Sequence, residues 1–154
     1  MKTNYDVKHI SWQEYDKLVE NILIQLKDYN IDVIVPVLRG GSVLGLSIAN
    51  NLKKPTKYIR IKRSCTNEEN SDFGEPKLLV YEKLPKIKNK NILICEDVVD
   101  TQKTINFAKK IISKYKPNNI YVCTLYNFSN NTSLISGYYG QQNWIVFPWE
   151  RKFK

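Results

Sequence analysis

The sequence has few of the residues that build disulfide or metal sites. Its 154 residues include one histidine, His9, and three cysteines, Cys65, Cys95 and Cys123. An odd number of widely spaced cysteines fits neither a disulfide framework nor a zinc site. Cys95 and Cys123 lie inside the apolar runs LICED and YVCTL. We therefore expect small buried thiols in a reducing, cytoplasmic location.

Long apolar runs and nucleotide motifs are also absent. No stretch approaches the ~18 apolar residues of a membrane span, and no signal-peptide pattern opens the chain, so we expect no membrane partner. Neither G-x-x-x-x-G-K-[ST] nor G-x-G-x-x-G occurs, so the common motifs that bind nucleoside triphosphates and dinucleotides are absent. With no internal repeat, low-complexity segment or linker, one domain over residues 1–154 is expected.

Positive charge is in excess. The chain has 24 Lys and Arg against 15 Asp and Glu, a net charge of +9. These cations are spread along the chain rather than gathered in one block, which indicates a general attraction for anions. Small phosphorylated ligands fit as well as RNA does, and lysines that only solvate the surface remain an equal alternative. A nucleic-acid partner is not expected.

Apolar periodicity predicts alternating strands and helices. Helical spacing predicts helices at about 11–28, 43–52 and 104–115. Short apolar or alternating runs predict strands at about 32–38, 57–63, 78–84, 91–96 and 120–126. This alternation predicts an α/β fold with a mostly parallel central sheet flanked by helices. The polar segment 64–76 predicts a long loop, with a mobile lid and plain disorder as equal readings.

The stretch NILICEDVVDTQKT, residues 91–104, places acids at the end of a buried strand. Ligands of parallel sheets bind at such ends, where the next helix offers free N–H groups. Residues 101–104 add hydroxyls and an ammonium group, which together make a phosphate cradle. Acids beside a cradle favour a ligand with hydroxyls and phosphate, such as a phosphorylated sugar. The alternative is a simple helix cap at Asp100 or Thr101, with Glu96 and Asp97 as solvated charges.

Three segments resemble one enzyme family. ILICEDVVDTQKT resembles the motif of type I phosphoribosyltransferases that binds 5-phosphoribosyl-1-pyrophosphate (PRPP): an apolar strand, two acids, a third acid and Thr-Gly-x-Thr. VPVLRGGS, residues 35–42, is similar to the family's pyrophosphate loop. NWIVFPWE, residues 143–150, is similar to the base-binding hood of bacterial xanthine-guanine phosphoribosyltransferases. The resemblance implies the type I fold, with a small C-terminal hood mainly at 128–154 and loop 64–76 as a lid.

The resemblance also implies residue roles. Glu96 and Asp97 would bind the ribose hydroxyls of PRPP, and Asp97 would contact Mg²⁺. Asp100 belongs to the same motif, would contact PRPP and would be the catalytic acid or base. Trp144 and Ile145 would bind the base. The remaining PRPP contacts would come from Arg39, Gly40, Gly41, Thr101, Gln102, Lys103 and Thr104. The family often has a cis peptide in the pyrophosphate loop.

Two positions depart from the family pattern. Gln102 replaces the glycine of Thr-Gly-x-Thr; if that position needs a positive φ, glutamine costs about 1–2 kcal/mol there. Purine-specific members place a lysine near Asn127, where this chain has none. Asn127 would contact the base as an uncharged donor that also accepts. Glu150 is a weaker candidate for a second metal contact.

The function implied is that of a Mg²⁺-dependent transferase of purine salvage. It would transfer the phosphoribosyl group of PRPP to a 6-oxopurine (hypoxanthine, guanine or xanthine), giving a nucleoside monophosphate and pyrophosphate. Two alternatives remain open: a PRPP- or nucleotide-sensing regulatory protein with the same fold, and a phosphoribosyltransferase for another base. The resemblance also implies a homodimer or homotetramer.

Overall fold

The computed structural model describes residues 6–65, 73–81 and 84–150. The helices in these ranges are α1 (Trp12–Leu26), α2 (Ser42–Leu52) and α3 (Lys103–Ser113), with short 3-10 turns at Pro85–Ile87 and Pro148–Glu150. The strands are β1 (Val7–His9), β2 (Val33–Leu38), β3 (Ile59–Cys65), β4 (Phe73–Tyr81), β5 (Asn91–Val99), β6 (Asn119–Asn127), β7 (Ile135–Tyr139) and β8 (Trp144–Val146). No described helix is both long and apolar enough to cross a membrane.

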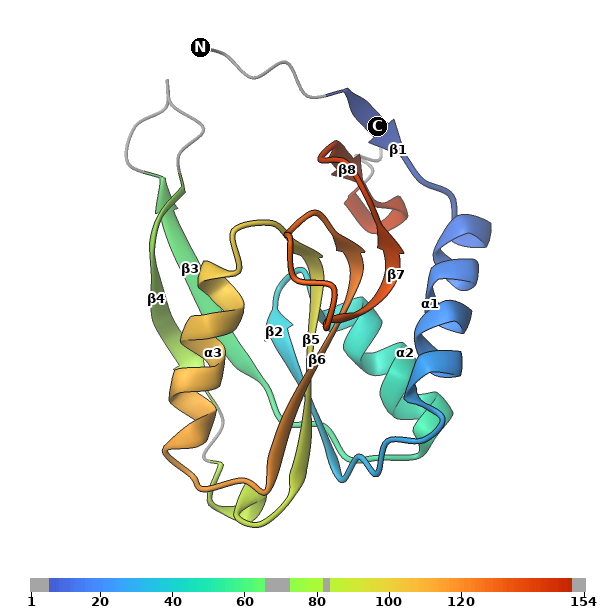
Figure 1. The fold of residues 1–154 in the computed structure, drawn as a ribbon. Coiled ribbons are helices and arrows are strands. Elements are labelled where there is room, and N and C mark those ends of the chain that lie inside the picture. The colour runs from blue at the N-terminus through green and yellow to red at the C-terminus, as the bar shows by residue number, and fades with distance from the viewer. Residues whose placement is uncertain (1–5, 66–72, 82–83, 151–154) are drawn as a thin grey trace.

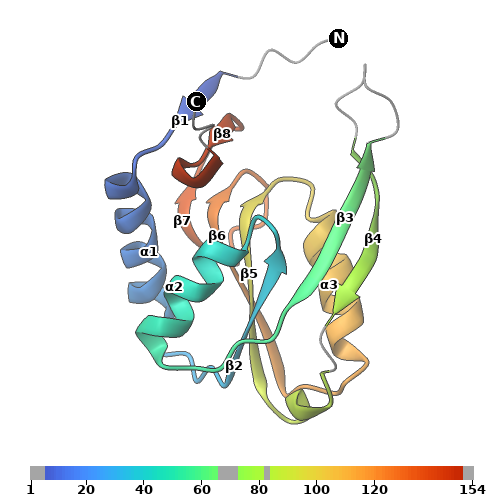
Figure 2. The ribbon, with the colours of Figure 1, turned by 180° about the vertical axis from the view of Figure 1, so that it is seen from behind.

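A six-stranded sheet in the order β4-β3-β2-β5-β6-β7 forms the centre of the molecule. All neighbours in it run parallel except β3 and β4, which are antiparallel. Helices α1 and α2 cover one face and α3 covers the other (Figure 1, Figure 2). The predicted α/β fold with a mostly parallel sheet is thus confirmed.

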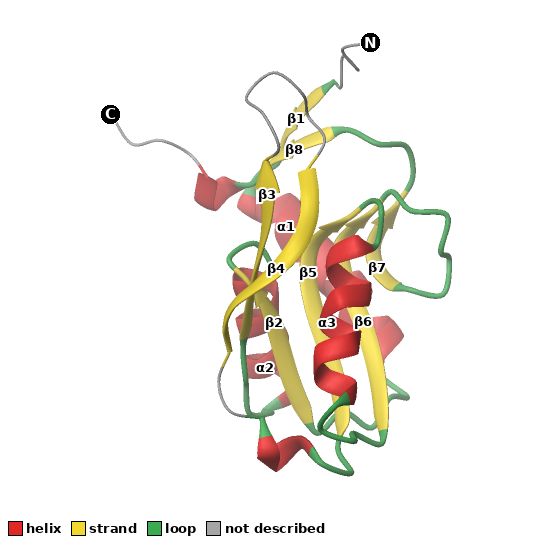
Figure 3. Cartoon of the chain, turned by 90° about the vertical axis from the view of Figure 1, so that its left-hand side faces the viewer, coloured by secondary structure: helices red, strands yellow, loops and turns green. Residues whose placement is uncertain are grey.

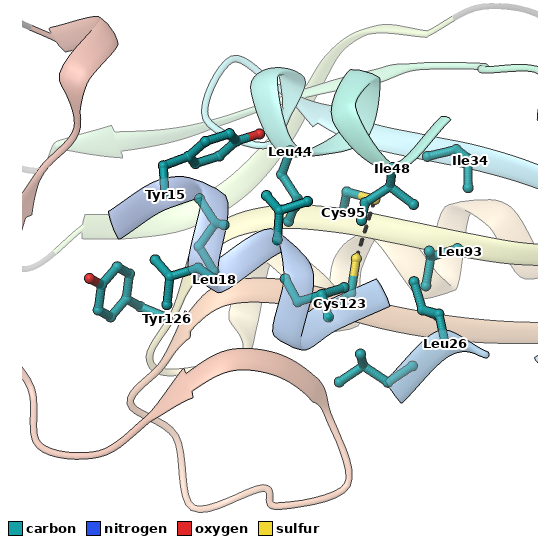
Figure 4. Packing of buried hydrophobic residues seen from close by; sticks show 14 of the residues in the cluster. Tyr15, Leu18, Leu26, Ile34, Leu44, Ile48, Leu93, Cys95, Cys123 and Tyr126 are labelled. Atoms are coloured by element: carbon teal, nitrogen blue, oxygen red, sulfur yellow. Dashed lines mark hydrogen bonds between the residues drawn. The ribbon is translucent and has the colours of Figure 1, made fainter. Parts of the chain in front are cut away.

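The first residues of strand β5 are almost all apolar because both faces of the strand are buried. Leu93 and Cys95 pack under α1 and α2, while Ile92 and Ile94 pack under α3, so both faces of the strand are buried. Cys95 lies opposite Cys123 of β6, with the two sulfur atoms 3.4 Å apart (Figure 4). Both thiols are free and buried, as predicted.

Helix α1 begins where the sequence places it. The Ser11 side chain accepts a hydrogen bond from the Glu14 N–H at 3.2 Å, and Glu14 accepts one from the Ser11 N–H at 2.8 Å. This reciprocal pair is the capping box expected from S-x-x-E. It fixes the entry of the helix whose apolar face covers the sheet.

The predicted loop 64–76 is wrong at both ends. Ser64 and Cys65 continue β3, and residues 73–76 begin β4, with Cys65 paired to Phe73. Backbone pairing at the edge of a sheet does not require an apolar pattern, so the polar sequence concealed these strands. Residues 66–72 of the predicted lid lie outside the described residues. Strand β4 also ends at Tyr81, before the predicted boundary at 84.

A small second sheet stands above the strand ends. Strand β1 pairs with β8 in parallel, Val7 opposite Trp144, so two strands that are far apart in the sequence lie side by side there (Figure 3). We call β1, β8 and residues 148–150 the hood sheet. Strand β7, by contrast, joins the main sheet beside β6. Three-residue strands are too short for periodicity to predict, which is why β1 was not expected.

Candidate functional site

A cavity of about 1030 Å³ opens at the carboxyl ends of the parallel strands. Four segments supply most of its lining: residues 37–42 at the end of β2 and in the turn that follows, 60–62 of β3, 96–105 from the end of β5 into α3, and 142–150 around β8. Parallel sheets place ligand sites at this edge because the turns that follow the strands converge there. Most of the sequence-predicted residues therefore meet in one place.

The turn after β2 lies very close to β5. A Cβ atom on Gly40 would sit 2.2 Å from Oδ2 of Asp97, and one on Gly41 would sit 2.1 Å from the carbonyl oxygen of Cys95. Only glycine permits these approaches. Arg39 and Gly40 line the cavity, whereas the N–H of Gly41 donates to the Val37 carbonyl at 2.9 Å. The cis peptide expected in this loop is Leu38–Arg39.

Two adjacent carboxylates, Glu96 and Asp97, line the cavity. Burial raises the pKa of Glu96 well above its ordinary value, and the charge of Asp97 raises it further. Burial also raises the pKa of Asp97, although the Val98 N–H opposes this by donating to Asp97 Oδ1 at 2.7 Å. Such a pair favours hydroxyl donors or a cation as its partner.

A metal ion would need further ligands here. Among the described residues, no group of three or more His, Cys, Asp or Glu side chains is arranged to hold a metal. Mg²⁺ commonly binds through one or two carboxylates together with substrate phosphates. Asp97 and Glu96 fit that role. Glu150 lies near enough for its charge to raise the pKa of Asp97 slightly, and its own carboxylate accepts from the Phe147 N–H at 2.9 Å.

The turn that opens α3 also faces the cavity. Thr101, Gln102, Lys103 and Thr104 all line it. Gln102 is the N-cap of α3 and has φ 59° and ψ 1°, so the positive φ considered for this position is confirmed. Its side-chain oxygen accepts a hydrogen bond from Nδ2 of Asn131 at 2.9 Å. A free first turn of a helix binds phosphate through its N–H groups and its positive dipole end.

Asn127 lies away from the cavity, contrary to expectation. It is fully buried at the end of β6 and is not part of the lining. Its amide nitrogen donates to the Asn131 carbonyl at 2.9 Å. Its amide oxygen accepts from the N–H and the hydroxyl of Ser129, at 3.0 and 2.7 Å. Because the amide is engaged in the loop after β6, this geometry runs against a base contact.

The aromatic residues of the tail divide into two groups. Phe147 and Trp149 stack with ring centroids 4.6 Å apart and planes 6° apart, and Trp149 also meets the edge of Tyr15 in α1. These rings attach the hood to the main domain. Trp144 is 52% exposed, while Ile145 is buried, and both line the cavity. Phe128, Phe147 and Trp149 line the cavity as well, but Trp144 is the most exposed of its aromatic residues.

Arg60, Lys62 and Gln142 are among the cavity residues that were not predicted from the sequence. In β3, Arg60 and Lys62 alternate with the buried residues Ile59 and Ile61. The alternation in KYIRIKR carried this signal. Gln142, in the loop between β7 and β8, donates to Oδ2 of Asp100 at 2.6 Å. A turn-rich tail gives no periodicity that would have indicated Gln142.

Comparisons with known proteins agree with this geometry. Residues 3–153 match the family described as "Phosphoribosyl transferase domain". The structure is similar to purine phosphoribosyltransferase from Pyrococcus horikoshii, with a TM-score of 0.80, 25% identity and 97% of each chain covered. It also resembles xanthine-guanine-hypoxanthine phosphoribosyltransferase from Helicobacter pylori, with a TM-score of 0.72, 16% identity and 94% and 93% covered, a likeness of fold alone.

A curated relative matches only in part. Hypoxanthine-guanine phosphoribosyltransferase from Bos taurus is 25% identical over 121 residues, which cover 71% of this chain and 54% of the relative. The chain thus spans about half the length of the curated relatives it matches.

Proposed function

The chain belongs to the phosphoribosyl transferase domain family, and on that basis we propose that it transfers the 5-phosphoribosyl group of PRPP to a purine base. One observation carries the proposal. The acidic pair Glu96 and Asp97 shares its cavity with two features that bind anions, the turn at Arg39–Gly40 and the first turn of α3. PRPP has the matching groups, since two hydroxyls lie on a ribose that carries a phosphate and a pyrophosphate.

The contacts to PRPP follow from this arrangement. Glu96 and Asp97 accept hydrogen bonds from the ribose hydroxyls. These hydroxyls take the place of the water molecules that would solvate the two carboxylates if they were exposed. Residues 101–104 hold the 5′-phosphate through backbone N–H groups, hydroxyls and the Lys103 ammonium group. The turn at Arg39 and Gly40 receives the pyrophosphate, and Gly41 acts beneath it as a packing position.

Cations on β3 extend the pyrophosphate site. Arg60 and Lys62 line the same cavity as Arg39, so three positive side chains of the cavity are available to the leaving group. Their charge stabilises the negative charge that pyrophosphate gains as it departs. Asp97, supported by Glu96, would hold Mg²⁺, which when bound supplies further positive charge toward the leaving group.

The proposed reaction is a substitution at C1′ of the ribose. The bond from C1′ to pyrophosphate breaks, a bond from C1′ to the purine nitrogen N9 forms, and the proton on purine N7 passes to Asp100. The ring of Trp144 stacks on the base, and Ile145 offers backbone contacts beside it. The hood sheet helps to exclude water, which would otherwise hydrolyse PRPP.

The acceptor base is proposed as a 6-oxopurine: hypoxanthine, guanine or xanthine. A second candidate is another base, favoured by one observation: the Asn127 amide is engaged within its own loop. Where family members carry a lysine for the purine oxygen, this chain offers no charged donor. The homo-oligomer and the cytoplasmic location expected from the sequence remain predictions.

A panel of bases tests the proposal. The protein is incubated with PRPP, Mg²⁺ and each of hypoxanthine, guanine, xanthine and adenine, and nucleoside monophosphates are separated by chromatography. Product with a 6-oxopurine supports the proposal, and product with adenine alone supports the second candidate. If none of the four bases gives product, the proposed transfer to a purine is wrong. A variant with Asp97→Asn serves as the matched negative control.

A further inference from the structure

A hydrogen-bonded network connects the loop after β6 to the turn that opens α3. Asn131 occupies its centre, and its Nδ2 donates to Oε1 of Gln102 at 2.9 Å. The Asn131 carbonyl accepts from the Asn127 amide at 2.9 Å, and its N–H donates to the Ser129 hydroxyl at 3.3 Å. Its Oδ1 accepts from the N–H and the hydroxyl of Ser133. Asn131 is thus held on several sides while one N–H group reaches Gln102.

The position of Gln102 explains why such support matters. Four described non-glycine residues have a positive φ: Lys53, Asn89, Gln102 and Lys116. Of these, Gln102 alone lines the cavity. A left-handed conformation is unfavourable for glutamine, since its Cβ crowds the following carbonyl. The hydrogen bond from Asn131 is similar in size to that cost, so it can offset the cost while glutamine remains in place.

The loop after β6 is itself fixed to the site. The Phe128 N–H donates to the carbonyl of Val99 at 2.8 Å, three residues before Gln102. Asn127 and Ser129 are buried, and their side chains bond to each other and to Asn131. The loop therefore meets the segment 99–102 through a backbone bond at one end and through a side-chain bond at the other. A rigid loop can hold Gln102 more firmly than a freely moving side chain could.

We propose that Asn131 is a positioning residue for phosphate binding. By donating to Gln102, it holds that residue in the left-handed conformation. The turn at 101–104 then presents the first turn of α3 to a phosphate group. Asn127 and Ser129 act through Asn131, so the position expected to contact the base instead supports the phosphate end of the site. This inference rests on the proposed function for the identity of the ligand.

Replacing Asn131 by leucine tests the inference. Asn131→Leu keeps about the same side-chain size, adds no charge beside the phosphate turn and removes the donor to Gln102. We expect the KM for PRPP to rise about tenfold, since a neutral hydrogen bond is lost. The KM for the base should change less than about twofold, because the hood is untouched. Ser133→Ala, which leaves the donor to Gln102 in place, is the matched control and should change neither.

A glycine at the left-handed position gives the decisive comparison. Glycine adopts a positive φ without support, so Asn131→Leu should have no further effect on the KM for PRPP in a Gln102→Gly background. An equal rise in both backgrounds would show that Asn131 acts on the loop in general, and the inference would be overturned. Thermal melting of each variant identifies any rise in KM that comes from unfolding.

A measurement without turnover separates this inference from the proposed function. Hydrogen exchange of the amides at 101–104 is followed in the free protein, and ribose 5-phosphate binding is measured by calorimetry. Faster exchange and weaker binding in Asn131→Leu support the positioning role, even if no base gives product. Product formation with unchanged exchange and unchanged PRPP KM overturns the positioning role and leaves the proposed function intact.

Discussion

The amide of Gln142 donates a 2.6 Å hydrogen bond to Oδ2 of Asp100, linking the loop before β8 to the turn before α3. Asp100 is exposed at the cavity, and Gln142 comes from the segment that carries the hood strand. The bond therefore joins the part of the site proposed to bind the base to the carboxylate proposed to accept its proton. It also gives that carboxylate a fixed orientation.

We predict that Gln142→Ala weakens base binding. Without the bond, the loop before β8 loses a contact to the main domain, so the KM for the base should rise about two- to tenfold, the range of one neutral hydrogen bond. The KM for PRPP should stay constant. Steady-state kinetics with each substrate varied in turn measure both values. Gln141→Ala is the matched control, and equal effects of the two substitutions would contradict this role for Gln142.

Asp100→Asn should reduce turnover far more than PRPP binding. An amide keeps the shape of the side chain but cannot accept the proton that the purine loses, so kcat should fall about 10²- to 10⁴-fold. Calorimetry with PRPP and Mg²⁺ should give an affinity within about threefold of the original protein. Equal losses in both measurements would show that Asp100 is a ligand contact and not the proton acceptor.

Substituting the two adjacent glycines should have different effects. In Gly41→Ala the new Cβ meets the backbone oxygen of Cys95, which cannot move aside, so we expect the free energy of unfolding to fall by about 1–3 kcal/mol. In Gly40→Ala it meets the Asp97 side chain, which can rotate away. That variant should keep more of its stability and lose PRPP affinity. Urea unfolding and calorimetry distinguish the two, and a Gly41→Ala protein as stable as the original would refute the packing role.

Stability in metal-free buffer should depend on pH through Glu96. Burial and the charge of Asp97 raise the pKa of Glu96 in the folded state above the ordinary value of 4.5. Between these two values the folded protein retains a proton that the unfolded chain has released, so stability falls as pH rises through that interval. Glu96→Gln removes this dependence.

The matching experiment uses urea unfolding of both proteins with a chelator present. The Glu96→Gln protein should be more stable than the original at pH 8, and the difference should shrink near pH 4, at about the ordinary pKa of glutamate. Asp97 is present in both proteins, so its contribution cancels to a first approximation. A variant that is less stable than the original at pH 8 would contradict the sign of the effect.

The sequence predicted the centre of this fold better than its edges. β2, β5 and β6 are buried on both faces, and continuous apolar runs identify such strands. β3 and β4 pair at an edge, where polar residues are tolerated, and so the predicted loop 64–76 was too long. β1 is stabilised by pairing with β8 from the other end of the chain, a long-range contact that no local pattern reports.

The site was predictable where the motif residues are also neighbours in the sequence. Glu96 and Asp97 lie near the end of β5 and Asp100 directly follows it, so their convergence follows from that strand alone. Asn127 could not be placed in the same way, because hydrogen bonds to Ser129 and Asn131 decide which way its amide points. Gln142 reaches Asp100 across 42 positions, which only the folded structure brings together.

Phosphorus NMR of a mixture of the protein, PRPP, Mg²⁺ and hypoxanthine tests the central claim most directly. The account predicts that the PRPP signals decline while pyrophosphate and inosine monophosphate appear in equal amounts, and that omission of the base prevents both. PRPP that persists unchanged with every purine would contradict the account, as would its conversion to ribose 5-phosphate and pyrophosphate without any nucleotide.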